Sequence, residues 1–306
     1  MLNNNLPLVS ICCATYNHEK FIKEALDGFL MQKVNFSVEI IVHDDASTDK
    51  TSNIIREYSN QNSQIIAVIK RKNLMSTGQN PTIDHALLRA RGKYIALCDG
   101  DDYWTDPYKL QKQVDFLENN PEFSLCFHNV MVSYPNSGKL IEFADLETRE
   151  YSGIECIETW KTATCSYLFR NQITFPPYFS IFGDIVILLQ LAETGKIYCI
   201  NDTMGVYRKH NNGISYTYTI HTHINLVRQY SEMNKYYNYK YNSVLKKRII
   251  DHCLNITYSE DVDYSRQLKY SWIIFITSPS YIFKRGFFIN LINSSIKSVL
   301  KFSHGK

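Results

Sequence analysis

The sequence predicts an α/β protein with a mostly parallel central sheet, helices on both faces and a helical C-terminal extension. Two observations lead to this prediction. Apolar, strand-like runs alternate with helical patterns over residues 7–132, and clusters of acids follow the ends of several of those runs. Ligands of such sheets bind beyond the carboxyl ends of the strands, which is where the acid clusters fall.

Apolar periodicity predicts the elements of the first half. The predicted strands are Leu8–Ala14, Val38–Val42, Gln64–Ile69, Tyr94–Cys98 and Phe123–Val132. The predicted helices are Phe21–Leu30, a second helix with Ser47 as its N-cap, a third over Ile83–Ala90 that stops at Gly92, and a fourth from Asp106-Pro107 to the residue before Asn120-Pro121.

The second half is less regular. A helical pattern covers Ile185–Ala192, and two short strand candidates lie near Ile197 and Val206. Further helices are expected over 222–235 and 243–257. The expected domains are therefore an α/β domain over 1–215, with halves 7–132 and 133–215, and a helical region over 216–306.

Composition limits the class of protein. The chain has 306 residues, of which 44% are hydrophobic and 21% charged, as in ordinary folded domains. A net charge of +3 is too small to indicate a nucleic-acid partner. We expect no secretory signal and no transmembrane helix. The eight cysteines form no Cys-x-x-Cys pair, which predicts buried reduced thiols in a cytoplasmic protein.

The most informative stretch is Tyr94–Trp104, an apolar run that ends in Asp99, Asp101 and Asp102. Carboxylates at the mouth of a buried strand repel each other and lose hydration, so something must compensate them. Mg²⁺ or Mn²⁺ is the simplest candidate, because such an ion is held by a few carboxylates, waters and substrate phosphates. Gly100 allows the backbone to approach a ligand closely. The alternative is a solvated turn that caps the next helix.

Four other segments can carry chemistry: Thr15-Tyr-Asn-His-Glu19, His43-Asp-Asp-Ala-Ser-Thr-Asp49, Phe182-Gly-Asp184 and Tyr207-Arg-Lys-His210. Each has a structural alternative. Asn17 can cap a helix, Asp45 can form an Asx-turn, Asp184 can be an N-cap, and His210 can be solvated. Acid clusters at several strand ends of one parallel sheet together favour a nucleotide diphosphate held with a metal.

The segments Val9–Asn17, Val42–Asp49, Ala90–Ile95 and Leu97–Tyr103 resemble the family 2 glycosyltransferases, which are inverting enzymes with the GT-A nucleotide-sugar fold. The resemblance is dense over about 7–132. It continues more loosely through Gly183-Asp184 and Val206–Ser215, and residues 216–306 carry no motif of the family.

By matching positions, the resemblance implies which residues bind the nucleotide. These are Thr15, Tyr16, Asn17, Glu19, Asp44, Asp45, Asp99 and Gly100. The resemblance places Asp44 and Asp45 near the base and ribose, and its Asp-x-Asp motif falls on Asp99 and Asp101.

The resemblance also implies the metal site and the base. Asp101 would be the principal ligand of Mg²⁺ or Mn²⁺, with Asp99 and His210 beside it. Asp184 would be the catalytic base, although Gly183 stands where the family more often has Glu. Asp102 is an extra acid to which the resemblance gives no role.

The activity implied is transfer of a sugar from a nucleotide-diphosphate sugar, expected to be a UDP-sugar, to a hydroxyl of a saccharide or lipid-linked saccharide. Surface polysaccharide or glycolipid synthesis would be the setting. A nucleotide-sugar-binding protein without catalysis and a nucleotidyltransferase stay open. Retention of Asp184 and His210 argues against the first, and the lack of a Gly-rich basic loop near the first strand argues against the second.

The segment Trp272–Phe302 alternates apolar clusters with Lys284, Arg285, Lys297 and Lys301, and it contains no acid. It is too short and too broken to span a bilayer as one helix. An apolar face with basic flanks suits an anionic membrane surface, which would place the protein at the inner face of the cytoplasmic membrane. Packing on the catalytic domain and a homodimer contact are equal alternatives.

Overall fold

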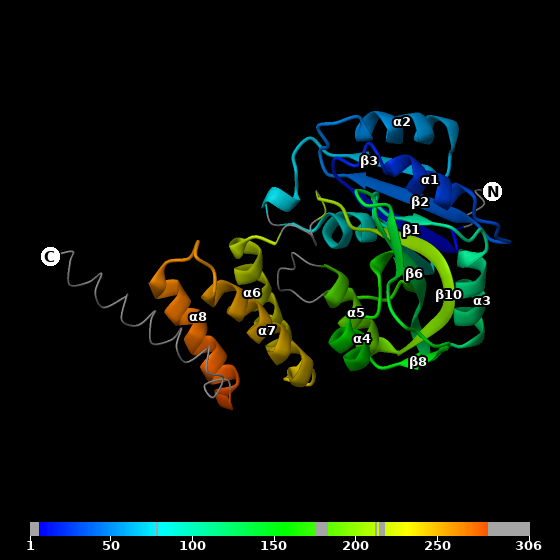
Figure 1. Ribbon diagram of the computed structural model, residues 1–306. Coiled ribbons are helices and arrows are strands. Elements are labelled where there is room, and N and C mark those ends of the chain that lie inside the picture. The colour runs from blue at the N-terminus through cyan, green and yellow to red at the C-terminus, as the bar shows by residue number, and fades with distance from the viewer. Residues whose placement is uncertain (1–5, 78, 175–182, 212, 214–217, 281–306) are drawn as a thin grey trace. The chain divides into compact units, whose positions relative to one another are not determined.

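The computed structural model describes residues 6–77, 79–174, 183–211, 213 and 218–280 (Figure 1). Contacts within the chain separate it into two units, 1–211 and 212–306.

The described part of the first unit forms a ten-stranded sheet in the order β3-β2-β1-β4-β9-β6-β10-β5, with β7 added to β6 and β8 added to β10. Figure 1 shows its strong curl along β10. The strands are β1 (Val9–Thr15), β2 (Val38–Asp44), β3 (Ile65–Ile69), β4 (Tyr94–Leu97), β5 (Tyr103–Trp104), β6 (Phe123–Tyr134), β7 (Lys139–Glu142), β8 (Arg149–Tyr151), β9 (Leu168–Arg170) and β10 (Lys196–Arg208).

The direction of the strands brings their carboxyl ends to one edge. β1 is parallel to both β2 and β4, and β2 is parallel to β3. β9 runs antiparallel to β4 and to β6, so β6 points the same way as β4. β10 is parallel to β6. The predicted mostly parallel sheet is confirmed, with the short antiparallel β9 between strands that the sequence placed in one parallel series.

Five helices accompany the sheet in the described part of the first unit. They are α1 (Ile22–Leu30), α2 (Thr51–Gln61), α3 (Lys109–Asn119), α4 (Gly153–Thr159) and α5 (Gly183–Thr194). Apolar residues of α1, α2 and α3 share one core with β1, β2 and β4. Trp104 lies in this core, where its indole N–H donates to the carbonyl of Cys165 at 2.8 Å. A buried aromatic side chain with its polar atom satisfied stabilises the packing of these helices on the sheet.

The second unit contains α6 (Ile220–Tyr236), α7 (Asn242–Thr257) and α8 (Tyr264–Thr277), which confirms the predicted helices over 222–235 and 243–257. Trp272 and Ile276 are exposed on α8. Residues 281–306, which carry the basic part of the predicted membrane-binding segment, lie outside the described residues. In the part of the chain that the structure describes, no helix is long and apolar enough to cross a bilayer.

Two predicted helix starts are wrong. α2 begins at Thr51 rather than after Ser47, because the Ser47 hydroxyl donates to Asp44 instead of capping the helix. α3 begins at Lys109, because the Asp106 carboxylate first accepts the N–H of Tyr108 and forms a turn around the proline. The third predicted helix is a π turn over Pro81–Ala86 followed by a 3-10 turn over Leu87–Arg89.

All eight cysteines are buried and free of disulfides, as the sequence predicted. Their burial raises the pKa of these thiols, including those of Cys12 and Cys126, well above the ordinary range. Protonated buried thiols are poor nucleophiles and behave as small apolar side chains. The cysteines therefore act in the core of the fold rather than in chemistry.

His43 is a polar residue inside this core. Its side chain is fully buried in β2, and neither ring nitrogen has a hydrogen-bond partner among the described residues. The ring stacks on His85 at 5.3 Å between centroids. Burial, followed by the charges of His85, Lys70 and Arg89, lowers the pKa of His43 to about 4. The folded protein therefore holds this imidazole neutral.

The depressed pKa predicts a loss of stability in acid. The unfolded chain takes up a proton near pH 6.5, whereas folded His43 takes it up only near pH 4, so stability falls as pH falls between those values. His43→Leu should remove about 2 kcal/mol of the wild-type loss between pH 7.5 and pH 5 in urea unfolding. The exposed His221, changed to Leu, is the control. Identical pH dependence in wild type and His43→Leu would contradict this assignment.

Candidate active site

The loops after β1 and β2 hold each other through reciprocal hydrogen bonds. Asn17 donates its backbone N–H to Ser47 Oγ at 2.9 Å and accepts the N–H of Thr48 at 2.8 Å. Glu19 donates its backbone N–H to the Asp49 carboxylate at 3.0 Å. The Glu19 carboxylate accepts the backbone N–H of Lys50, also at 3.0 Å. The polar side chains of both loops thus form a fixed rim at the carboxyl edge of the sheet. The nucleotide roles of Asn17 and Glu19 stay predictions.

Asp44 and Asp45 are buried, and both anchor loops. Asp44 accepts the hydroxyls of Ser47 and Ser52. Asp45 accepts the backbone N–H groups of residues 74 and 75 at 2.7 and 3.1 Å. Asp45 therefore satisfies backbone N–H groups, as the structural alternative expected, but these belong to a distant loop and do not form an Asx-turn. The nucleotide roles of the two acids stay predictions. Tyr16 precedes Asn17 in the loop after β1, and its side chain is 43% exposed.

Gly100 is required by a close approach of Thr15. A Cβ atom at position 100 would lie 2.4 Å from Thr15 Oγ1 and 2.6 Å from Thr15 Cβ. The N–H of Gly100 also donates to the carbonyl of Ala14 at 2.9 Å. The sequence attributed this glycine to close approach of a ligand, whereas in the structure the close neighbour is the end of β1. Thr15 in turn contacts His18, with 3.1 Å between its Oγ1 and the ring Nδ1.

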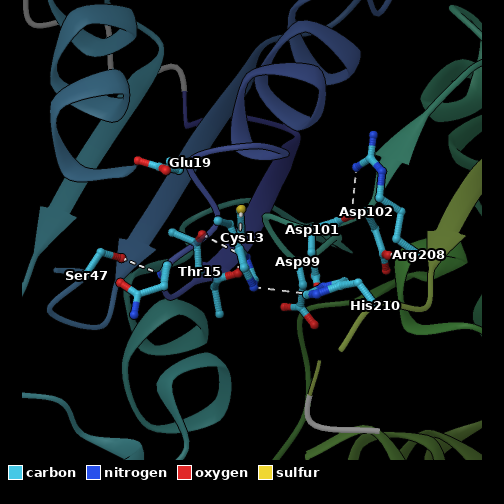
Figure 2. A network of polar contacts seen from close by, with 12 residues as sticks. Cys13, Thr15, Glu19, Ser47, Asp99, Asp101, Asp102, Arg208 and His210 are labelled. Carbon is cyan, nitrogen blue, oxygen red and sulfur yellow. Dashed lines mark hydrogen bonds and ion pairs between the residues drawn. The ribbon is translucent and has the colours of Figure 1, made fainter. Parts of the chain in front are cut away.

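Asp101 lies between two imidazoles. His210 Nε2 lies 3.0 Å from Asp101 Oδ2, and His18 Nε2 lies 3.6 Å from the same oxygen. Burial alone would raise the pKa of Asp101, but His18 and His210 outweigh it and lower that pKa. Figure 2 shows His210 beside Asp101 and Asp99, with Thr15, Glu19 and Ser47 on one side and Arg208 with Asp102 on the other.

This arrangement fits a divalent cation. One ligand atom each from His18, Asp101 and His210 lies within 4.8 Å of the others, and this is the metal-capable group that the described residues contain. Imidazole nitrogens and a carboxylate oxygen are common ligands of first-row divalent metals. Asp99 is not part of this group, and its predicted metal role stays a prediction. The sequence did not assign a role to His18.

Asp102 ties the loop after β4 to the end of β10. It is buried and accepts the backbone N–H of Arg208 at 2.8 Å. The Arg208 guanidinium donates to the carbonyl of Asp101 at 2.6 Å and to Glu24 at 2.6 Å, and it lies 4.2 Å from the ring centre of Tyr103. Burial, together with the charge of Asp101, raises the pKa of Asp102 well above its usual range. The extra acid thus has a structural contact that its position in the sequence did not reveal.

The charge of Asp184 acts on Asp99. Burial, Asp101 and Asp184 raise the pKa of Asp99 to about 7. Asp184 lies in the first turn of α5, where its Oδ1 accepts the N–H of Ile185 at 2.8 Å. Burial raises the pKa of Asp184, and the backbone N–H groups offset only part of that effect. Asp184 therefore lies near enough to Asp99 for its charge to act there, although the two acids are far apart in the sequence. Its role as the base stays a prediction.

Sequence reasoning missed His18 and the contacts of Arg208. Both residues stand inside segments that the sequence singled out, Thr15–Glu19 and Tyr207–His210. A polar residue three positions after Thr15 can turn back onto its hydroxyl, and that spacing was the available signal for His18. The contact between His18 and Asp101 depends on the folded sheet and had no signal in the sequence.

Comparison of the sequence with known proteins gives three findings. Residues 10–168 match the sequence profile of the family described as "Glycosyl transferase family 2". An uncharacterized protein of Mycobacterium tuberculosis is 40% identical over 212 residues, which cover 67% of this chain and 60% of that protein. The putative teichuronic acid biosynthesis glycosyltransferase TuaG of Bacillus subtilis is 30% identical over 217 residues, which cover 70% of this chain and 84% of TuaG.

Among solved structures, TarS 1-349 of S. aureus in complex with UDP-GlcNAc has a TM-score of 0.68 and 17% identity, over 97% of this chain and 92% of that one. This likeness confirms the GT-A fold that the sequence resemblance predicted. The chain spans only 60% of the length of the M. tuberculosis relative.

The contact between Gly100 and Thr15 predicts a specific steric coupling. Gly100→Ala should cost about 1–3 kcal/mol of unfolding free energy, because the added methyl overlaps Thr15. In a Thr15→Gly background the same change should cost at least about 1 kcal/mol less, because the overlapping atoms are gone. Urea unfolding of the four chains in this cycle measures both values. Additive effects of the two substitutions would contradict the proposed overlap.

Proposed function

Because this chain belongs to glycosyl transferase family 2, we propose that it moves a sugar from a nucleotide-diphosphate sugar to an acceptor hydroxyl, with inversion at the anomeric carbon. The observation that carries the proposal is Asp101 between His18 and His210 at the carboxyl edge of the sheet, with the charges of Asp101 and Asp184 acting on Asp99 nearby. Such an edge is where open α/β sheets bind nucleotides.

We assign the donor to the rim made by the loops after β1 and β2. Asn17 and Glu19 fix these loops to each other, so the donor would meet a surface that is ordered before it binds. The partly exposed Tyr16 ring is suited to contact with the base. UDP is the nucleotide we expect, which fits the UDP-GlcNAc complex of the structural neighbour TarS.

We assign Asp184 as the general base. It would take the proton of the acceptor hydroxyl while the acceptor oxygen forms a bond to the anomeric carbon and the bond to the diphosphate oxygen breaks. Burial raises the pKa of Asp184, which increases the affinity of its carboxylate for that proton. Its Oδ1 is held by the N–H of Ile185, so the carboxylate is oriented before the acceptor arrives. An inverting displacement needs no covalent nucleophile from the protein.

Asp101 and His210 would hold the divalent cation, Mg²⁺ or Mn²⁺, which when bound would neutralise the charge that develops on the leaving diphosphate. Arg208 helps to position the metal ligand Asp101, because its guanidinium donates a hydrogen bond to the backbone carbonyl of Asp101. Arg208 ends β10 and His210 lies two residues beyond it, so both residues are placed by the end of that strand. The carboxylate and the imidazole are therefore positioned by the sheet.

We assign the reaction to the synthesis of a surface polysaccharide or glycolipid, with a saccharide or lipid-linked saccharide as acceptor. The relative TuaG, whose name refers to teichuronic acid biosynthesis, supports this assignment. A lipid-linked acceptor would bring the protein to the inner face of the cytoplasmic membrane.

Product analysis separates this proposal from its two alternatives. The full chain would be incubated with radiolabelled UDP-glucose or UDP-GlcNAc, with Mn²⁺ and a mixture of lipid-linked saccharides. Transfer of label to a saccharide supports the proposal. Binding of UDP without turnover would indicate a nucleotide-sugar-binding protein. In a parallel incubation with a sugar phosphate and a nucleoside triphosphate, formation of a nucleotide sugar would indicate a nucleotidyltransferase.

The role of Asp184 predicts a separation of binding from turnover. Asp184→Asn should keep the UDP affinity of the wild type and lose transfer by about 10²-fold or more, because the amide cannot accept the proton. Asp145→Asn makes the same change of charge at an exposed acid and should leave both quantities unchanged. Calorimetry with UDP and a radiometric transfer assay measure the two effects. Near-normal transfer by Asp184→Asn would exclude Asp184 as the base.

A further inference from the structure

His18 has a position that the roles assigned so far do not use. Its side chain is partly buried, its Nδ1 lies 3.1 Å from Thr15 Oγ1, and its Nε2 faces Asp101 Oδ2 at 3.6 Å. His210 approaches that same oxygen from the end of β10. The two rings are nearly perpendicular, with 5.9 Å between their centroids, so they converge on one carboxylate from different elements.

His18 and Asp101 face each other without a hydrogen bond between them. A separation of 3.6 Å is too long for a hydrogen bond. When its Nδ1–H donates to Thr15, Nε2 presents a lone pair to a carboxylate oxygen. Two acceptors that face each other in a partly buried place are stabilised by a positive group between them.

Thr15 contacts the ring nitrogen of His18 that points away from Asp101, which is the place of the oxygen that usually accepts the second N–H of a metal-bound histidine. A histidine that binds metal through one nitrogen almost always donates its other N–H to an oxygen, which fixes the direction of the ring. Thr15 is itself held in place by the close approach of Gly100. The orientation of the His18 ring toward Asp101 is therefore built into the ends of β1 and β4.

We propose that His18 is a third protein ligand of the metal, together with Asp101 and His210, and that this set of two imidazoles and one carboxylate favours a transition-metal ion such as Mn²⁺ over Mg²⁺. The inference rests on the metal site of the proposed function and adds a ligand and a metal preference to it. Mg²⁺ prefers oxygen ligands, whereas imidazole nitrogen suits first-row transition metals.

Manganese binding by the full chain tests this without an activity assay. Electron paramagnetic resonance measures the free Mn²⁺ that remains after addition of protein and UDP, and competition with Mg²⁺ gives the selectivity. His18→Ala should weaken Mn²⁺ binding by at least about ten-fold, with a much smaller effect on Mg²⁺. Thr15→Val keeps the shape of the side chain but removes the hydroxyl, and should weaken Mn²⁺ binding less than His18→Ala does. His221→Ala, at an exposed histidine, should change neither affinity.

Pulsed paramagnetic resonance on the wild-type chain keeps the proposal testable even where a variant does not fold. Modulation of the Mn²⁺ echo by two imidazole nitrogens is expected, and modulation by one alone would overturn the inference. Wild-type Mn²⁺ affinity in folded His18→Ala, or equal losses for Mn²⁺ and Mg²⁺, would also overturn it. These results are distinct from failure of the proposed function, in which Mn²⁺ binds through His18 but no sugar is transferred.

Discussion

Three carboxylates at the end of β4, of which Asp102 is buried and Asp99 and Asp101 are half-buried, are the constraint on which the rest of the site depends. Burial disfavours the charged form of a carboxylate, so each of these acids needs a compensating partner or a proton. Two imidazoles compensate Asp101 and lower its pKa. The pKa of Asp99 rises to about 7, and that of Asp102 also rises, although Asp102 accepts the N–H of Arg208. The partners come from the loop after β1 and from β10. The acids therefore connect parts of the sheet that are distant in the sequence.

The same constraint explains why small details near the site are specific. Gly100 has no side chain because Thr15 occupies the space, and Thr15 contacts the ring of His18. Arg208 supports Asp101 through its carbonyl and reaches Glu24 on α1 with the other end of its guanidinium. A substitution in any of these residues acts on Asp101 through a short chain of contacts, which is how an ordered environment fixes the geometry of a reactive group.

The sequence predicted the sheet and the edge at which the acids meet, because parallel strands must place their carboxyl ends together. It could not predict the antiparallel β9, whose three residues are too few to show a direction. Helix starts failed where several polar side chains competed for the same N–H groups, as at Ser47 and Asp106. The contacts of His18 and Arg208 were hidden for a different reason, since each depends on a partner about eighty or more positions away.

The central claim is that Asp101 and its two imidazoles form the metal site at which a nucleotide diphosphate binds. Anomalous X-ray diffraction from crystals grown with Mn²⁺ and UDP tests it most directly. The account predicts a manganese peak in contact with Asp101 and the flanking histidines, adjacent to density for the diphosphate. A manganese peak elsewhere, or a nucleotide bound away from the carboxyl edge of the sheet, would contradict it.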